Sequence, residues 1–411
     1  MRRLPAVPVF LAIEGFASFA SMLTFTVTNL YYVTELGMTP LLLVLCGTAM
    51  ELGIVLCEIP TGVVADTLGR RASVVLSFAI MGAATALFGV FEAPWAIVLA
   101  YGLWGIGYTF QSGALEAWIV DEVGDERMPR VLLRGGQVGW AAALAGVVAS
   151  TAVGSVDLRT AIVAGGIGFL ALSAFLALAM PETGFRPVRS ASRPALADAI
   201  RTARVGLGLV RSSPILLLML GIALCFGLWT ESIDRLWQAH FLASVEIPDV
   251  LGLGEVGWIG LLTGLAFGLG VLTNELGVRR LERLPQEATA RVLLRLHAVL
   301  LVAAVGFALA GSFVLAIVAY VGVAGARSLA VPLGRIWTNR EISDPGTRAT
   351  VLSIVNQADA FGQVAGGPAI GAIGTGISLR AALAIGAAAL APALVLYGKA
   401  ARRHAVPTQA A

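Results

Sequence analysis

Eight charged side chains lie within stretches of sequence that are otherwise almost entirely apolar. They are Glu14, Glu51, Glu58, Glu231, Asp234, Arg235, Arg327 and Asp359. A charged group inside a membrane is costly, and where it occurs it marks a path for an ion or a substrate. Because burial favours the neutral form of a carboxylic acid, a carboxyl group in such a place can take up and release a proton near neutral pH. The eight residues therefore predict a mostly acidic cavity with two fixed positive charges.

Asp359 is the first candidate for the group that carries the proton. Polar side chains close to it in the sequence indicate a surface in contact with water, namely Asn356, Gln357 and Gln363. Glu51 is the second candidate, and Arg327 is the expected counter-charge of either carboxylate. One alternative stays open, in which Asp359 and Arg327 form a permanent ion pair between neighbouring helices.

Two further groups of residues have competing interpretations. Glu14 and Glu58 serve either proton coupling or a packing role at the membrane interface. Trp104, Tyr108, Phe110 and Gln111 are suited to line an aromatic cavity for flat, lipophilic or cationic compounds. The alternative for the rings is that they face lipid.

The elements that position these residues are helices long enough to cross a membrane. Of the 411 residues, 58% are hydrophobic and only 13% are charged, and the mean hydropathy is +0.86. A soluble domain has about 25% charged residues, and a spanning helix needs roughly 20 mostly apolar residues. The apolar runs predict an all-α polytopic membrane protein with twelve transmembrane helices, at 7–33, 41–65, 72–91, 95–118, 132–153, 160–180, 214–239, 256–276, 292–312, 314–334, 350–374 and 379–398.

The basic residues predict the orientation of these helices. Cytoplasmic loops of multi-pass proteins carry the excess of arginine and lysine. With the N-terminus in the cytoplasm, 24 of the 28 basic residues lie in cytoplasmic segments, and the outer loops hold only Arg159 and Arg380. Both termini are therefore expected in the cytoplasm. A single lysine among many arginines, with abundant alanine, glycine and valine, indicates a bacterium with GC-rich DNA, so we expect the plasma (inner) membrane of a bacterium.

The chain divides into two halves that resemble each other. Residues 1–180 and 214–411 each hold six predicted helices, and residues 181–213 form a cytoplasmic linker with a predicted amphipathic helix. Leu158-Arg159-Thr160-Ala161 has a counterpart in Leu379-Arg380-Ala381-Ala382, and two other short matches keep the same order. Two similar halves are the plan of a transporter whose substrate site lies between the halves near the membrane midplane.

One short motif lies between the second and third predicted helices, and it reads Gly62-x3-Asp66-x2-Gly69-Arg70-Arg71. Its glycines allow a sharp turn and the close approach of a neighbouring helix, and Asp66 can face the positive end of another helix. The two arginines are expected to pair with acids near the end of the fourth helix. The candidate acids are Glu116, Asp121 and Glu122.

This motif resembles the loop signature of the major facilitator superfamily, G-x-x-x-D-x-x-G-R-R/K, and it occurs in the corresponding loop. A degenerate copy with Asn274 in place of the aspartate follows the eighth predicted helix, and Pro181-Glu182-Thr183 is similar to an element at the end of the sixth helix in that family. The resemblance implies two six-helix halves in that family's fold. It also implies a conformational latch made of Gly62, Asp66, Gly69, Arg70, Arg71 and Asp121. The alternative is that the arginines only set the topology.

Within that family the chain resembles bacterial drug:proton antiporters. The resemblance implies a secondary active transporter that works by alternating access and exports small lipophilic compounds in exchange for protons. Import of a small metabolite together with protons is the alternative, because the two buried arginines also suit an anionic substrate.

Other classes of function are disfavoured by the sequence. It contains no paired aspartate motif, no His-Glu-x-x-His and no Gly-x4-Gly-Lys-[Ser/Thr], so the signatures of prenyl-transfer, zinc and ATP chemistry are missing. We expect neither an enzyme nor a metal site, with a polytopic enzyme or a scaffold as a remote alternative. The arginines form no single patch of the kind that binds nucleic acid. The expected partners are a small-molecule substrate, protons as coupling ion and the lipid bilayer, with no cofactor, and the expected state is a monomer.

Overall fold

The computed structural model describes most of the chain, and the regular elements of the described part are helices. The described residues are 3–185, 204, 206–208, 210–248, 250, 252–273, 277, 279–281, 283–342 and 348–405. Most of the predicted amphipathic helix in the linker, and Asn274 of the degenerate motif, lie outside these residues.

The chain forms two compact units. The first comprises Met1–Met38, Ala49–Ala199 and Leu251–Gly264, and the second comprises Thr39–Thr48, Ile200–Val250 and Leu265–Ala411. Two helices, those that begin at Pro40 and Glu255, contribute residues to both units. The domain boundaries expected from the sequence, at 180 and 214, stay a prediction.

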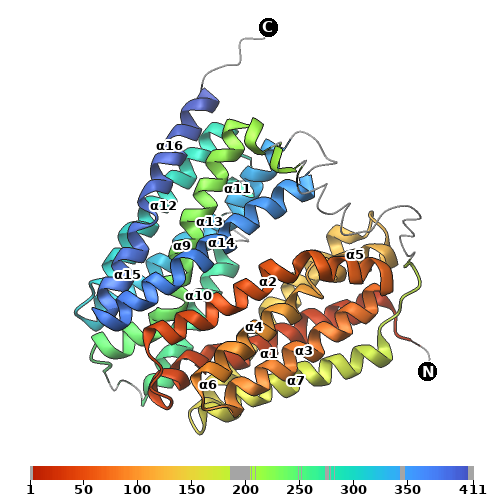
Figure 1. The fold of residues 1–411 in the computed structure, drawn as a ribbon, viewed down its shortest axis with the longest axis horizontal. Helices are drawn as coiled ribbons and strands as arrows, with labels where there is room; N and C mark the ends of the chain where they lie inside the picture. The colour runs from red at the N-terminus through yellow and green to blue at the C-terminus, as the bar shows by residue number, and fades with distance from the viewer. Residues whose placement is uncertain are drawn as a thin grey trace. The chain divides into compact units, whose positions relative to one another are not determined.

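The first unit is built mainly from seven helices, labelled in Figure 1. They are α1 (Ala6–Thr34), α2 (Pro40–Leu68), α3 (Arg70–Val90), α4 (Pro94–Thr109), α5 (Ala114–Val123), α6 (Met128–Gly154) and α7 (Leu158–Ala179). α1 packs against α6 and α7, and α3 packs against α7 and α4. Their shared core holds Phe78, Trp118, Phe169 and Leu176, all of them buried.

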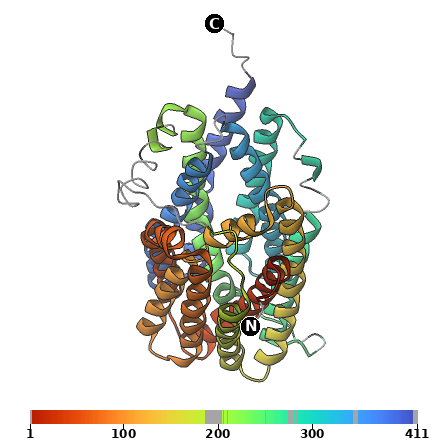
Figure 2. The ribbon, with the colours of Figure 1, turned by 90° about the vertical axis from the view of Figure 1, so that its right-hand side faces the viewer.

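The second unit is built mainly from the helices of the C-terminal half, drawn green to blue in Figure 1. They are α9 (Pro214–Ser244), α10 (Glu255–Thr273), α11 (Arg279–Leu281), α12 (Gln286–Ala308), α13 (Phe313–Glu341), α14 (Arg348–Gly376), α15 (Leu379–Ala388) and α16 (Ala391–Ala405). α9 packs along α14, and α12 packs along α13 and α16. The core of this unit includes Leu293, Leu333, Trp337 and Tyr397. Within each unit the long helices run side by side, as the two views in Figures 1 and 2 show.

Glycines allow the closest helix pairs. A Cβ atom added at Gly146 of α6 would lie 2.6 Å from the carbonyl oxygen of Phe19 on α1. In the second unit, a Cβ atom at Gly227 of α9 would lie 2.0 Å from the carbonyl oxygen of Asp359 on α14. Since real side chains do not approach backbone so closely, the two helix pairs require glycine at these positions.

The predicted spans agree with the helices, with two differences. Within the described residues, ten helices are long and apolar enough to cross a membrane, with Leu379–Arg403 taken as one of them, and the predicted spans 95–118 and 350–374 are not among the ten. The predicted span 95–118 is broken into α4 and α5 by a turn before Gly113, and the span 379–398 is broken before Pro392. Proline explains the second break, because it cannot donate the backbone hydrogen bond that would continue the helix. The count of twelve membrane-spanning helices stays a prediction.

The repeat in the sequence corresponds to a repeated local structure. α7 begins at Leu158 after Asp157, whose carboxylate accepts a hydrogen bond from the backbone N–H of Thr160 at 2.9 Å. α15 begins at Leu379 after Ser378, whose hydroxyl oxygen accepts from the backbone N–H of Ala381 at 3.1 Å. Each helix therefore has a side-chain cap that satisfies one of its free N–H groups.

Removal of either cap is expected to destabilise its helix by a similar amount. Asp157→Ala and Ser378→Ala should each cost about 1 kcal/mol, the usual value for an N-cap. The hydroxyl of Thr160, with backbone N–H groups, lowers the pKa of Asp157. This stabilisation is therefore present above the carboxyl's unfolded pKa and is lost as the pH falls through its lower folded value. Thermal unfolding of the purified variants at pH 7 and at acid pH measures both effects. A larger loss for Asp157→Ala at acid pH than at pH 7 would contradict the assignment.

Candidate functional site

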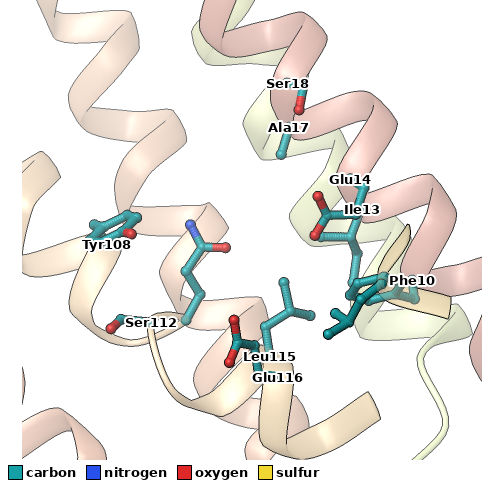
Figure 3. Close-up of a pocket in the computed structure, with 11 residues that line it drawn as sticks. Phe10, Ile13, Glu14, Ala17, Ser18, Tyr108, Ser112, Leu115 and Glu116 are labelled. Atoms are coloured by element: carbon teal, nitrogen blue, oxygen red, sulfur yellow. The ribbon is translucent and has the colours of Figure 1, made fainter. Parts of the chain in front are cut away.

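A cavity of about 340 Å³ lies in the first unit, among α1, the turn between α4 and α5, and α6. Figure 3 shows Glu14 of α1 and Glu116 of α5 with their carboxylates directed toward the same space. Gln111 and Ser112 contribute polar groups from the turn, and Tyr108 contributes an aromatic ring. The cavity is therefore acidic and polar on part of its wall and apolar on the rest.

Helix periodicity and a helix break place these side chains together. Phe10, Glu14 and Ser18 are four residues apart on α1, so they lie along one face of that helix and line the cavity. On the opposite wall, the turn that ends α4 brings Gln111 and Ser112 to the cavity. The sequence prediction of one continuous helix over 95–118 missed this arrangement.

Among the described residues, the two carboxylates in the cavity have no positively charged partner. In the described part of the chain, neither Glu14 nor Glu116 has a hydrogen bond or an ion pair, while the two interact with each other electrostatically. Glu58 differs, because its carboxylate accepts a hydrogen bond of 2.7 Å from the hydroxyl of Ser112. Glu116 was predicted as one of three candidate partners for the motif arginines, whereas the structure places it at the cavity.

Trp104 does not line the cavity but packs against Tyr108, which does. Its ring stacks on Tyr108, with centroids 5.8 Å apart and an angle of 7° between the planes, and it meets Phe25 edge-on at 5.7 Å. Gln111 points its amide toward the sulfur of Met81, 3.4 Å away. Gln111 is therefore in contact with the cavity, as predicted, whereas Trp104 contacts a residue that lines it, Tyr108.

A second cluster of charges lies in the second unit. Arg327 of α13 donates two hydrogen bonds to the carboxylate of Asp234 on α9, at 2.5 and 2.9 Å. The guanidinium also lies 5.6 Å from the ring centre of Trp229, within the range of a cation–π contact. The alternative of a permanent pair between Arg327 and Asp359 is wrong for this structure, because the ion pair joins Arg327 to Asp234.

Asp359 lies near this pair without joining it. Its carboxylate accepts a hydrogen bond of 2.9 Å from the amide of Gln363, one turn further along α14, and it interacts electrostatically with Arg327 and Asp234. Of the neighbouring polar residues, Asn356 is exposed and Gln357 is half-buried. The close contact at Gly227 holds the backbone of α14 against α9 at this level.

The remaining predicted charges have different surroundings. Glu231 and Arg235 form an ion pair of 3.6 Å, with only 1% and 13% of their side chains exposed. A Cβ atom at Gly47 would lie 2.1 Å from a carboxylate oxygen of Glu231 and 2.2 Å from the guanidinium of Arg235. This buried pair is tightly enclosed, and the predicted role of both residues in the cavity stays a prediction. Glu51 is half-buried, one turn beyond Gly47 on α2.

The loop motif forms a network of short contacts at the junction of α2 and α3. Gly69 is the single residue between these helices and has a φ of 120°, which explains the glycine. Arg70 forms an ion pair of 2.8 Å with Asp121 of α5 and lies 4.0 Å from Asp66. Of the three candidate acids, Asp121 is therefore the one that Arg70 contacts. At Gly62 a Cβ atom would meet no described atom within 4 Å, so the close approach expected there is not present in this structure.

The segment after α7 is bound to the same network. The backbone N–H of Arg71 donates to the carboxylate of Glu182 at 2.9 Å, and the indole N–H of Trp118 donates to the carbonyl oxygen of Pro181 at 2.7 Å. Glu122 accepts hydrogen bonds from the hydroxyl of Thr183 at 2.8 Å and from the backbone N–H of Gly184 at 2.9 Å. Pro181-Glu182-Thr183 was recognised in the sequence by its resemblance to a family element. The sequence did not indicate which residues this segment contacts.

Replacement of Gly69 is expected to loosen this junction. In Gly69→Ala, a non-glycine residue would have to adopt a φ of 120°, and its Cβ atom would lie 3.0 Å from the carboxylate of Glu182. Strain of this kind costs about 1–3 kcal/mol. Gly113→Ala is the control, because no heavy atom lies within 4 Å there and φ is −76°. Thermal unfolding in detergent compares the two, and an equal melting temperature for both variants would contradict the prediction.

Comparisons with known proteins agree with this architecture. The family model described as Major Facilitator Superfamily matches residues 10–333. The MFS-type transporter YxaM of Bacillus subtilis (strain 168) is 27% identical over 94 residues, which span 23% of this chain and about a quarter (24%) of that relative.

Solved structures resemble the chain over nearly its whole length. The nucleoside transporter NupG has a TM-score of 0.74 at 13% identity, covering 96% of this chain and 98% of that one. A POT family transporter in complex with 5-aminolevulinic acid has a TM-score of 0.72 at 12% identity, covering 97% and 96%. A bacterial homolog of the human lysosomal transporter Spinster has a TM-score of 0.66 at 14% identity, covering 97% and 95%. At such low identity these likenesses establish the shared fold.

Proposed function

Because the chain belongs to the Major Facilitator Superfamily, and is therefore a membrane transporter of that type, we propose that it is a proton-coupled antiporter. In this proposal it exports small lipophilic compounds and works by alternating access. Transport follows from the family, whereas the coupling ion, the direction and the substrate are the proposal. We place the protein as a monomer in the inner membrane of a bacterium with both termini in the cytoplasm, an orientation that the distribution of arginine supports.

The observation that carries the proposal is the environment of Asp359. The positive charge next to it, Arg327, is already bound by both carboxylate oxygens of Asp234. The hydrogen bond that the described residues give to Asp359 comes from Gln363, a neutral side chain. Asp359 can therefore gain a proton without leaving Arg327 unpaired, which is the costly outcome when one partner of an ion pair is neutralised. A coupling carboxylate requires this property.

The proposed class of substrate rests on the ion pairs that the two arginines already form. Arg235 is enclosed with Glu231, and Arg327 is held by Asp234, so each cation already has a carboxylate partner. This favours lipophilic or cationic substrates over anions, and therefore disfavours the alternative of uptake of an anionic metabolite. Symport of a small metabolite is the second candidate, because the side chain of Arg327 is still 34% exposed and offers a positive site to a polar substrate.

Inside-out vesicles from cells that express the protein test the proposal. The vesicle lumen is acidified, and a pH dye in the lumen reports proton movement as lipophilic compounds and metabolites are added outside. Antiport predicts release of protons from the lumen on addition of a lipophilic compound. Asp359→Asn should lose this response. Asp66→Asn changes the loop motif and leaves the charge cluster intact, so its effect on the response measures how far the loop motif by itself contributes to transport. Proton release that requires a metabolite preloaded in the lumen would instead support symport.

The ion pair between Arg70 and Asp121 is the part of the proposed latch that can be tested by charge reversal. Arg70→Asp or Asp121→Arg alone brings two like charges together, and each should slow transport about fivefold if the pair stabilises one of the two access states by roughly 1 kcal/mol more than the other. The double variant restores opposite charges and should recover most of the rate. Transport rates in matched proteoliposomes measure this, and equally slow single and double variants would contradict a latch role for the pair.

A further inference from the structure

We propose that the cavity of the first unit binds an organic cation that carries a flat aromatic group. The inference rests on the proposed transport function, and it names the class of substrate. It follows from four properties of the cavity: its charge, its rings, its size and the absence of a competing cation among the described residues that line it.

The charge of the cavity is negative and uncompensated. Glu14 and Glu116 enter it from opposite walls, and Figure 3 shows both carboxylates directed toward the open space. The described lining residues include neither lysine nor arginine. Two carboxylates in a partly desolvated site repel each other, and a positive ligand placed between them removes that repulsion and gains the attraction of both. An anionic ligand would add to the repulsion.

The apolar part of the wall selects an aromatic body. Phe10 lies on the α1 side and Tyr108 on the α4 side, and Trp104 stacks behind Tyr108 and fixes its orientation. The faces of aromatic rings attract cations as well as other rings. The wall therefore provides a ring surface next to the carboxylates, which matches a ligand that has an ammonium group and an aromatic ring close together.

Polar neighbours and the size of the cavity limit the ligand further. Gln111 and Ser112 also line the cavity, but Ser112 donates its hydroxyl to Glu58 and the amide of Gln111 is directed toward Met81. The carboxylates are therefore the charged groups left for a ligand, and Ser18 adds a hydroxyl to the lining. A volume of about 340 Å³ is near the lower end of the range of roughly 300–1,000 Å³ for small-molecule sites. It suits a compound with one or two rings.

Equilibrium dialysis of the purified full chain in detergent tests the inference without any proton gradient. The probe is carbon-14-labelled benzyltrimethylammonium, which has one ring and a permanent positive charge. Neopentylbenzene, its neutral isostere, serves as competitor, and labelled benzenesulfonate serves as the anion of similar size. We expect saturable binding of the cation, no competition by the neutral isostere at equal concentration and no saturable binding of the anion.

Variants assign the binding to this cavity. Glu14→Gln and Glu116→Gln keep the size of each side chain, and each should weaken binding of the cation about tenfold, as expected for loss of one charged partner. The double variant should weaken it about a hundredfold. Glu126→Gln removes an exposed carboxylate outside the cavity and should leave binding unchanged. Size-exclusion profiles establish that each variant is folded, and the two single variants provide independent tests if the double variant is not.

The outcomes separate this inference from the proposed function. Equal binding of the cation to wild type and to both single variants, or binding of benzenesulfonate as tight as that of the cation, would overturn the inference. Absence of saturable cation binding would also overturn it, even if vesicles still exchange protons for neutral compounds. Cation binding that depends on Glu14 and Glu116, without any proton movement in vesicles, would support the cavity and contradict the proposed antiport.

Discussion

Asp359→Asn is expected to reduce proton-coupled transport to the level of vesicles without the protein. An asparagine keeps the size of the side chain and can still accept the hydrogen bond from Gln363, but it cannot exchange a proton. Arg327 keeps its two hydrogen bonds to Asp234, so the guanidinium is not left unpaired. Transport driven by a pH gradient in proteoliposomes measures the loss, which should exceed about a hundredfold if the proton step is obligatory, equivalent to roughly 2.7 kcal/mol.

Two controls separate a coupling role from a structural one. Exchange of labelled for unlabelled substrate across the same membrane needs no net proton movement, so Asp359→Asn should retain it. Gln363→Leu removes the hydrogen bond to Asp359 and should shift the pH dependence of transport without abolishing transport. If Asp359→Asn abolishes exchange as well as net transport, the residue is required for folding or substrate binding, and the coupling role is contradicted.

Gly227→Val is expected to prevent correct packing of α9 on α14. A Cβ atom at Gly227 would already lie 2.0 Å from the carbonyl oxygen of Asp359, and valine adds two methyl groups to it. Overpacking at a helix contact costs about 1–3 kcal/mol when side chains can adjust, and here the obstacle is backbone, so a larger cost is expected. The yield of monodisperse protein from mild detergent and its melting temperature measure the effect.

A matched glycine provides the control for this prediction. Gly268 lies in the middle of α10, and a Cβ atom there would meet no heavy atom within 4 Å. Gly268→Ala should leave the yield unchanged or raise the melting temperature slightly, because alanine favours helix more than glycine by roughly 1 kcal/mol. Similar yields for Gly227→Val and Gly268→Ala would show that the close packing of α9 and α14 is not required.

The positions of the helices were predictable because hydropathy is a strong and local signal. The break at Gln111-Ser112-Gly113 was missed although these residues are typical of a turn, because apolar residues lie on both sides of it, up to Phe110 and again from Ala114. The break matters for the site, since it brings Gln111 and Ser112 to the cavity. Both breaks left a trace in the sequence, the polar turn residues in one case and Pro392 in the other, but the apolar runs on either side led to the prediction of one continuous span in each case.

The identities of the charged residues were predictable, but their pairing was not. Any carboxylate on a neighbouring helix was an acceptable partner for Arg327, and the distance along the chain favoured Asp359 on the next helix. The structure instead joins Arg327 to Asp234, which is 93 residues away. Pairing depends on how helices rotate about their axes, and this rotation is set by close contacts such as the one at Gly227, which no composition or spacing reveals.

The loop motif illustrates the same limit. Gly69, Arg70 and Arg71 were recognisable from their spacing, and the need for glycine at the turn follows from its φ of 120°. The partner of Arg70 was narrowed to three acids, and Asp121 is the one in contact. That Glu182 accepts the backbone N–H of Arg71 could not be predicted, because it requires the end of α7 and the start of α3 to be known in space.

The central claim is that proton movement is coupled to movement of a small organic substrate. The most direct test reconstitutes the purified protein in proteoliposomes with a pH dye in the lumen and benzyltrimethylammonium as the added compound. With the lumen acidic, wild-type protein is expected to take up the cation and release protons together, and Asp359→Asn is expected to do neither. Uptake of the cation at the same rate with and without the pH gradient, or proton release that is unchanged in Asp359→Asn, would contradict the claim.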